Sequence, residues 1–298
     1  MTDGAARRRH GLALAATSAS LFSFNTVCAR TAFDAGANAT AGNAARFAFA
    51  TAVFGWLLVL RRGGARLSGR QRLAAAALAV PVALSSFGYL GAVEYIPVST
   101  AVLVVYTYPI WVGLIARLTR GEPLGGARVV AIFLAFAGVA IALDVHASAM
   151  PDARGLALAA LAAIGMAATM LGSSRLVRDI DPGAVNFYLS SAATGIFVVL
   201  LLVGDPHLPR SALGHLGFAG LLVTLPLAQL ALLTAVDRAG PVVTAVVMNL
   251  EPLITIGLAV ILLGEHVSAV QLGGAALVVA AIAIMRRTPA TTGRRARA

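Results

Sequence analysis

The chain has 298 residues, of which 59% are hydrophobic and only 12% are charged. A mean hydropathy of +0.87 excludes an ordinary soluble globular protein and indicates several membrane-spanning helices of about 20 residues each. The net charge of +11 does not indicate a nucleic-acid partner, because the arginines lie mainly in short loops between apolar stretches, as the positive-inside rule predicts.

The apolar stretches predict an all-α integral membrane protein with ten transmembrane helices. In chain order, the predicted helices cover residues 11–31, 41–60, 73–94, 98–118, 128–145, 155–173, 183–204, 212–235, 241–263 and 269–286. The run Arg7-Arg8-Arg9 before the first stretch is similar to the start of a signal peptide, but this stretch is long and contains Asn25 and Arg30. We therefore expect an uncleaved first helix that spans the bilayer.

The arginines also predict the orientation of the helices. If the amino terminus lies in the cytoplasm, most loop arginines lie there too, whereas Arg154 and Arg210 fall outside and Arg30 and Arg46 lie within or near the outer face. This bias favours an even number of spans with both termini in the cytoplasm. Every basic residue is arginine, and Ala and Gly are abundant, which is typical of a GC-rich bacterial genome. We therefore expect a bacterial membrane protein.

A shift of 143 residues aligns the two halves of the chain. Pro109 then meets Pro252, and the Gly-Glu pair at 121–122 meets the pair at 264–265 without a gap. In both copies the proline lies near the middle of a predicted span. Each copy holds five spans, an odd number, so the second copy is inverted in the membrane relative to the first.

The predicted organisation is therefore two inverted five-helix repeats, at 11–145 and 155–286. Inverted repeats with proline-interrupted helices at matching positions are typical of secondary transporters, whose binding site lies where the repeats meet. Such carriers work by alternating access, in which one half moves against the other around the site.

Three segments carry a family resemblance: "AARFAFATAVFGWLL" (44–58), "VSTAVLVVYTYPIWVGLIARLTRGEPL" (98–124) and "LALLTAVDRAGPVVTAVVMNLEPLITIGLAVILLGEHVS" (230–268). They resemble the EamA domains of the drug/metabolite transporter (DMT) superfamily, in two copies that cover nearly the whole chain. The resemblance implies a ten-helix inner-membrane carrier of small metabolites, often an exporter of amino acids or related compounds. One departure is in the first span, where residues 21–25 read Leu-Phe-Ser-Phe-Asn and many members begin with Trp-Gly.

Glu251 is the first candidate site residue, because it lies ten residues into the stretch 241–263, near the bilayer centre. A charge there costs roughly 2.5–3.5 kcal/mol on insertion scales, so it faces a protein interior or a wet cavity. Pro252 follows directly and frees a backbone carbonyl. Glu251, with Asn249 beside it, is a candidate for substrate binding and for proton coupling, since burial disfavours a charged carboxylate. The alternative is a structural acceptor that braces the break.

Tyr108 is the counterpart of Glu251 in the first repeat. It shares a helix face with Trp111 and lies near Tyr106. A carboxylate opposite aromatic rings can hold an ammonium group by charge and by cation–π attraction. This pattern favours an amino-acid-like or cationic metabolite as the small-molecule substrate.

Polar residues in other spans are further candidates for the substrate site. Asn25, Tyr89 and Gln229 lie in the first, third and eighth predicted helices. Side chains of this kind also bond neighbouring helices, so helix packing is the alternative for each of them. Arg46, about six residues inside the second span, is placed to hold a substrate carboxylate by a bidentate bond. It can instead extend to the outer surface or pair with Glu94.

No metal-ligand cluster, phosphate-binding Gly-Lys-Ser/Thr loop or Ser-His-Asp spacing occurs, so we expect no cofactor, no metal and no enzymatic activity. The lone Cys28 excludes disulfides within the chain. The pairs Gly125-Gly126 and Gly273-Gly274 allow close helix approach, which suits packing within the chain or a homodimer face. Two other functions stay open, a membrane-embedded enzyme for lipid-linked substrates and a non-transporting membrane subunit.

Overall fold

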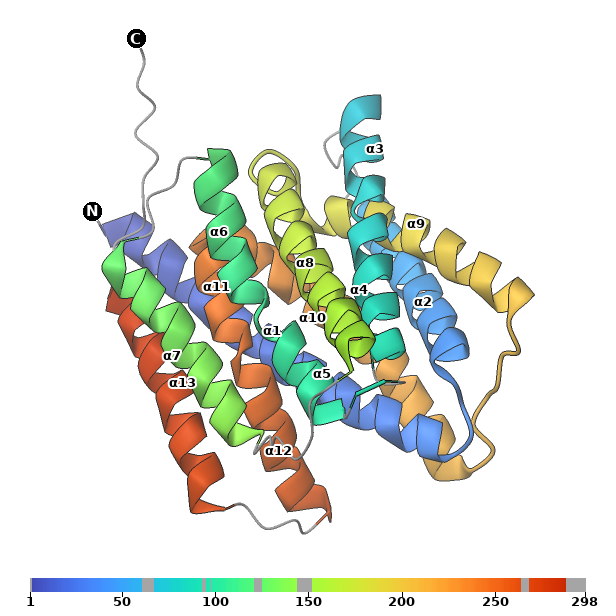
Figure 1. Ribbon diagram of the computed structural model, residues 1–298. Helices are drawn as coiled ribbons and strands as arrows, with labels where there is room; N and C mark the ends of the chain where they lie inside the picture. The colour runs from blue at the N-terminus through green and yellow to red at the C-terminus, as the bar shows by residue number, and fades with distance from the viewer. Residues whose placement is uncertain are drawn as a thin grey trace.

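The computed structural model describes residues 2–60, 67–92, 95–96, 98–120, 125–143, 152–263 and 268–287, and its regular elements in these ranges are helices (Figure 1). In chain order they are α1 (Thr2–Asp34), α2 (Ala39–Leu60), α3 (Gly69–Ala77), α4 (Ala79–Ala92), α5 (Val98–Val105), α6 (Tyr108–Arg120), α7 (Gly126–Ala142), α8 (Ala153–Leu176), α9 (Pro182–Val203), α10 (Ala212–Ala239), α11 (Pro241–Met248), α12 (Leu250–Leu263) and α13 (Ala269–Arg287).

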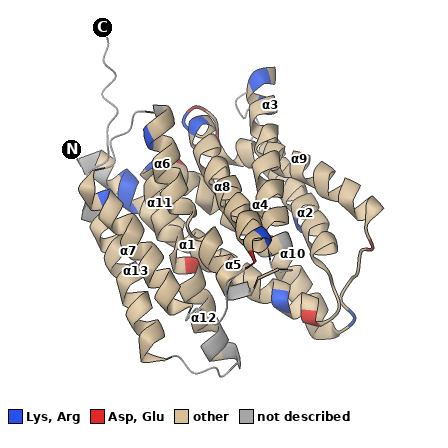
Figure 2. Ribbon diagram, in the orientation of Figure 1, with Lys and Arg blue, Asp and Glu red and all other residues tan. Residues whose placement is uncertain are grey.

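Among the described residues, eight helical segments are long and apolar enough to cross a membrane, and the shorter apolar helices α7 and α13 complete the ten predicted spans. Three of these spans consist of two consecutive helices, α3 with α4, α5 with α6, and α11 with α12. Figure 2 shows basic residues at the ends of α3, α6 and α8, while the middle of the bundle is almost free of charge. This distribution agrees with the expected all-α membrane fold.

The first helix is longer than predicted, because α1 begins at Thr2 and includes Arg7, Arg8 and Arg9, which we expected to precede it. Arg7 donates to both carboxylate oxygens of Asp237, at 2.9 and 3.0 Å, and Arg8 donates to the carbonyl oxygen of Met285 at 2.6 Å. These contacts hold the first turns of α1 against the ends of α10 and α13. Arginine also favours helix, so the chain continues as helix beyond the apolar stretch.

The helix bounds reproduce the 143-residue repeat. Shifted by 143, Ala39–Leu60 falls on Pro182–Val203, and Val98–Val105 falls on Pro241–Met248. The helices α6 and α12 correspond in the same way to within one residue at their starts. Two five-helix repeats are therefore present in the fold as they are in the sequence.

The helix pairs obey the same repeat. The helices α2 and α9 pack against each other, as do α7 and α13, so in these two pairs a helix meets its own counterpart. The broken spans also meet, through α6 of the first repeat and α11 of the second. The 143-residue shift also relates two other pairs to each other. It places α1 on α8 and α4 on α10, so the contact of α1 with α10 corresponds to the contact of α8 with α4. Figure 1 shows α7 beside α13 at one edge of the bundle and α2 beside α9 toward the other. Each half consequently buries its apolar faces mainly against the other half.

The breaks in α5/α6 and α11/α12 follow from proline chemistry. Proline has no N–H to donate, and its ring clashes with the carbonyl four residues earlier. The helix stops at Val105 and resumes at Tyr108, just before Pro109, and it stops at Met248 and resumes at Leu250, just before Pro252. The break in the second repeat therefore lies at Asn249, three residues ahead of Pro252 rather than at it.

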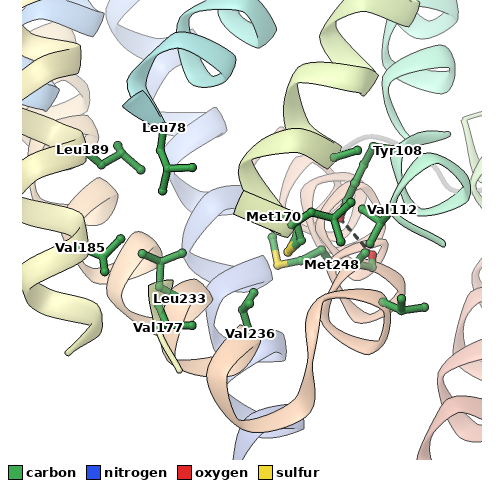
Figure 3. Packing of buried hydrophobic residues seen from close by; sticks show 14 of the residues in the cluster. Leu78, Tyr108, Val112, Met170, Val177, Val185, Leu189, Leu233, Val236 and Met248 are labelled. Carbon is green, nitrogen blue, oxygen red and sulfur yellow. Dashed lines mark hydrogen bonds between the residues drawn. The ribbon is translucent and has the colours of Figure 1, made fainter. Parts of the chain in front are cut away.

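The core lies between the two repeats. Figure 3 shows Tyr108, Val112, Met170 and Met248, from three different spans, packed together at one place in this core. All four side chains are buried. The broken helices are therefore anchored in the protein interior where the two halves meet. The predicted site residues Tyr108, Asn249 and Glu251 lie at these breaks.

Candidate functional site

Glu251 lies in the first turn of α12, directly after the break at Asn249, and is partly buried. The positive end of a helix dipole favours a carboxylate in this position. Its backbone carbonyl accepts from the Ser23 hydroxyl at 2.7 Å and from the Thr255 hydroxyl at 2.9 Å. A hydroxyl of α1 thus braces the broken helix, which leaves the side-chain carboxyl of Glu251 available for other contacts.

Tyrosine side chains surround this carboxyl. Tyr89, Tyr106 and Tyr108 all lie close enough to Glu251 to interact with it electrostatically, and the Tyr106 hydroxyl is within reach of its carboxyl. Under the 143-residue shift, Tyr106 is the counterpart of Asn249, so the two breaks contribute to one polar cluster. The sequence predicted that an aromatic residue of the first repeat faces Glu251, and the structure places Tyr106 there.

Tyr108 has a different role. Its side chain is fully buried, and its hydroxyl donates to the carbonyl oxygen of Ala245 in α11 at 3.0 Å. That carbonyl lacks its usual helical donor, because the N–H of Asn249 bonds to Val246 instead, at 3.2 Å. Tyr108 therefore joins the two broken helices to each other. Trp111 is partly buried, and its indole N–H donates at 3.2 Å to the hydroxyl of Thr107, which lies in the break between α5 and α6.

Asn249 occupies the break between α11 and α12, and its side chain is fully buried. Both polar atoms of its amide lack a hydrogen-bond partner. A buried polar group without a partner is rare and requires an explanation such as water, strain or a ligand. Asn249 is thus the buried amide closest in sequence to Glu251 and the one most directly tied to the helix break.

Tyr89 also lines a cavity of about 150 Å³. Its polar lining consists of Asn43 and Arg46 of α2 and Ser86 and Tyr89 of α4. The Arg46 guanidinium stacks over the Phe47 ring at 5.4 Å and donates weakly to the Asn25 amide oxygen at 3.4 Å, while its Nε has no partner. No carboxylate of the described residues pairs with Arg46. Glu94, its alternative partner from the sequence, lies outside the described residues, as do Glu122 and Glu265.

Two other candidates are engaged in helix packing. The Asn25 amide donates to the Leu221 carbonyl at 2.9 Å and to the Thr224 hydroxyl at 2.6 Å, which ties α1 to α10. The amide oxygen of Gln229 accepts from the Ser190 hydroxyl at 3.4 Å, between α10 and α9. These contacts fit the packing alternative for both residues. Asn25 also contacts Arg46, so it contributes to the wall behind the cavity.

The structure thus arranges the predicted residues in two groups that meet at Tyr89. One group contains Glu251 and Asn249 at the broken helices, and the other contains Arg46 in the cavity. Tyr89 lines the cavity and interacts with Glu251. Sequence reasoning missed Asn43 and Ser86 and left Tyr106 in a secondary position. Of these residues, only Asn43 could have been identified as a site candidate from the sequence, since it lies one turn before Arg46 on the same helix face.

The described residues contain no group of three or more His, Cys, Asp or Glu side chains that could hold a metal ion. The available chemistry is one carboxyl, one guanidinium and several hydroxyl and amide groups between apolar helices. These groups can bind a small charged solute by ion pairing and hydrogen bonding.

Two inverted five-helix halves, with interrupted helices at the level of a polar cluster, define a multi-pass membrane protein of the transporter class. The model of the EamA-like transporter family matches residues 9–143 and 153–287, so the chain belongs to this family. A solved structure, described only as the crystal structure of a protein, has a TM-score of 0.77 and 20% sequence identity. The similarity covers 92% of this chain and 96% of that one, and it shows the fold. No curated protein matches the sequence.

Proposed function

We propose that this protein is a secondary active transporter that exports amino acids or related small metabolites across the bacterial inner membrane by alternating access. The observation that carries the proposal is the contact between the two interrupted helices. The Tyr108 hydroxyl joins α6 to α11 within one turn of both breaks, and the carboxyl of Glu251 lies at the same level. Interrupted helices that meet at a charged group are the usual setting for a transport site.

The charges along the path fit a zwitterionic substrate. Arg46, whose Nε is unpaired, attracts a carboxylate in the cavity. Glu251, beside Tyr106, attracts an ammonium group at mid-depth. A substrate that bears both charges is therefore matched at both groups, whereas a singly charged solute is matched at one of them and a neutral solute at neither.

Glu251 also supports coupling to a proton. A partly buried carboxyl within reach of a hydroxyl can lose its charge when it binds a proton and regain it on release. Proton binding and ammonium binding compete for the same oxygen atoms. This competition provides a physical basis for exchanging protons against substrate.

The test is transport by the purified protein in proteoliposomes. We expect uptake of labelled amino acids, with a rate that changes when a pH gradient is imposed. Cells that overproduce the protein are expected to resist toxic amino-acid analogues, because the protein removes them. Absence of amino-acid transport in both assays, with the protein correctly inserted, would contradict the proposed cargo. Turnover of a lipid-linked substrate instead would establish the enzyme alternative.

A further inference from the structure

Asn43 is an unexplained polar residue next to Arg46. It lies inside α2, where asparagine is a poor helix former, and only 7% of its surface is exposed. Its side-chain oxygen is buried and has no hydrogen-bond partner. Leaving such an acceptor unpaired costs about 1–3 kcal/mol, so its presence calls for a partner that the folded chain does not supply.

Asn43 and Arg46 are three residues apart on one helix and line the same cavity. Residues at this spacing lie about 5–6 Å apart on one helix face. Each has a buried side-chain atom without a hydrogen-bond partner, an acceptor in Asn43 (Oδ1) and a donor in Arg46 (Nε). A small solute satisfies both when it carries a charged acceptor group and a hydrogen-bond donor on neighbouring carbon atoms.

The rest of the cavity limits the size and charge of this ligand. Its volume of about 150 Å³ is below the range of about 300–1,000 Å³ for drug-sized ligands, so it suits a solute of a few heavy atoms. The polar lining contains no carboxylate, and Phe33 and Leu221 provide an apolar wall. Glu251 does not line the cavity, so the donor group of a ligand bound there meets Asn43 rather than Glu251.

We propose that Asn43 and Arg46 form a subsite for small α-amino and α-hydroxy acids, in which Asn43 determines specificity. Arg46 holds the carboxylate, and the Asn43 amide oxygen accepts a hydrogen bond from the amino or hydroxyl group on the adjacent carbon. A simple carboxylate leaves Asn43 unpaired, and an amine leaves Arg46 unpaired. This inference rests on the proposed function, since it names the chemical class that the carrier recognises.

The chain offers a matched control. Asn186 is the counterpart of Asn43 under the 143-residue shift, is 1% exposed, and has two unpaired amide atoms. The residue that corresponds to Arg46 is Leu189, and Asn186 does not line this cavity. Substituting Asn186 therefore removes a buried, unpaired amide from the equivalent helix without touching the subsite.

The experiment measures binding of labelled L-alanine to the purified protein, in competition with L-lactate, propionate and ethylamine. We expect L-alanine and L-lactate to bind the wild type about tenfold more tightly than propionate, which is the value of one hydrogen bond. In Asn43→Ala this preference should disappear, with the affinity for propionate unchanged. Arg46→Met should lose all three acids, and Asn186→Ala should keep the wild-type profile.

Each other result overturns the inference. If Asn43→Ala weakens all three acids equally, or if the wild type binds propionate as well as L-alanine, Asn43 does not recognise the α-substituent. If L-alanine is transported in proteoliposomes but the preference is absent, only the inference fails and the proposed function stands. If no acid binds and no amino acid is transported, both fail. Thermal melting and size-exclusion profiles identify any variant that has lost its fold, and Asn43→Ser then replaces Asn43→Ala.

Discussion

The hydroxyl oxygens of Thr51 and Thr194 lie 3.2 Å apart, and the two residues are separated by 143 positions, the shift of the internal repeat. Each is therefore the counterpart of the other, and the axis that relates the two halves passes between them. Next to this contact, the rings of Phe47 and Phe197 stack with their centroids 5.4 Å apart. The α2–α9 pair thus forms a close, symmetric seam between the halves.

The Thr51–Thr194 contact is expected to contribute weakly to stability. Hydrogen bonds between membrane helices average about 0.6 kcal/mol in double-mutant cycles, because the separated helices also find partners. We predict that Thr51→Val and Thr194→Val each lower the thermal midpoint slightly, with a coupling energy of about 0.5 kcal/mol in the double variant. Unfolding of all four proteins in detergent measures this coupling. Strictly additive effects would show that the two hydroxyls do not interact.

Much of the fold could be predicted from the sequence, because bilayer thickness fixes the length of a span and the repeat fixes the order. The shift found from Pro109 and Pro252 also relates the bounds of α2 and α9. The start of α1 could not be predicted, since it depends on Asp237 and Met285, which are far away in the sequence. Periodicity describes one helix at a time and contains no information on such partners.

The same limit applies to the site. Periodicity placed Tyr108 opposite Glu251, but the loss of one helical hydrogen bond at Ala245 draws the Tyr108 hydroxyl to the backbone. The turn at the break places Tyr106 beside Glu251 instead. The sequence places Asn43 one turn before Arg46, but its lack of a hydrogen-bond partner is a property of the packed structure alone.

Glu251→Gln is predicted to abolish transport or to uncouple it from the pH gradient. Glutamine has nearly the same shape but carries no charge and takes up no proton. In the proposed mechanism, Glu251 forms a charge pair with the ammonium group of the substrate. Loss of one partner of a buried charge pair costs about 2–5 kcal/mol, so uptake should fall by roughly 30-fold or more. The measurement is proteoliposome uptake with and without a pH gradient.

Thr255→Val is the control, since this hydroxyl bonds only to its own helix, and it should change uptake by less than about twofold. Unchanged transport in Glu251→Gln would exclude Glu251 from the site.

Tyr108→Phe is predicted to destabilise the protein. Without the hydroxyl, the Ala245 carbonyl is buried and unpaired, which costs about 1–3 kcal/mol. Tyr106→Phe is the matched variant. Its hydroxyl faces Glu251 rather than the backbone, so we expect impaired transport with little loss of stability. Thermal unfolding and uptake measured on both variants test this separation. The reverse pattern would mean that Tyr108 belongs to the substrate path.

The orientation in the membrane can be tested with single cysteines. Cys28 is buried and is the only cysteine, so Cys28→Ala provides a suitable background. In this background, Asp205→Cys should react with a membrane-impermeant maleimide in intact cells, because the arginine distribution predicts that the loop after α9 lies outside. Arg175→Cys, at the end of α8, should react only after the cells are permeabilised. The opposite pattern would show that the termini are not cytoplasmic as predicted, and labelling of both positions in intact cells would contradict the predicted order of the spans.

The two neighbouring glycines of α13 are predicted to behave differently. A methyl group at Gly274 would lie next to the backbone nitrogen of Ala142, on α7, and 2.6 Å from the carbonyl oxygen of Gly138. Separating the two helices to relieve this clash costs typically about 1–3 kcal/mol. Nothing lies within 4 Å of the same position at Gly273, and alanine is the better helix former, so Gly273→Ala should be neutral or stabilising.

Thermal melting of Gly273→Ala and Gly274→Ala in detergent, together with their oligomeric state, tests this prediction. We expect a lower midpoint for Gly274→Ala only, because Gly274 packs against α7 of its own chain. A homodimer through this face would need the exposed position at Gly273, and Gly273→Leu would then shift the protein toward monomer. If Gly274→Ala melts like the wild type, the close α7–α13 contact does not stabilise the fold. If Gly273→Leu leaves a dimer intact, that dimer uses another surface.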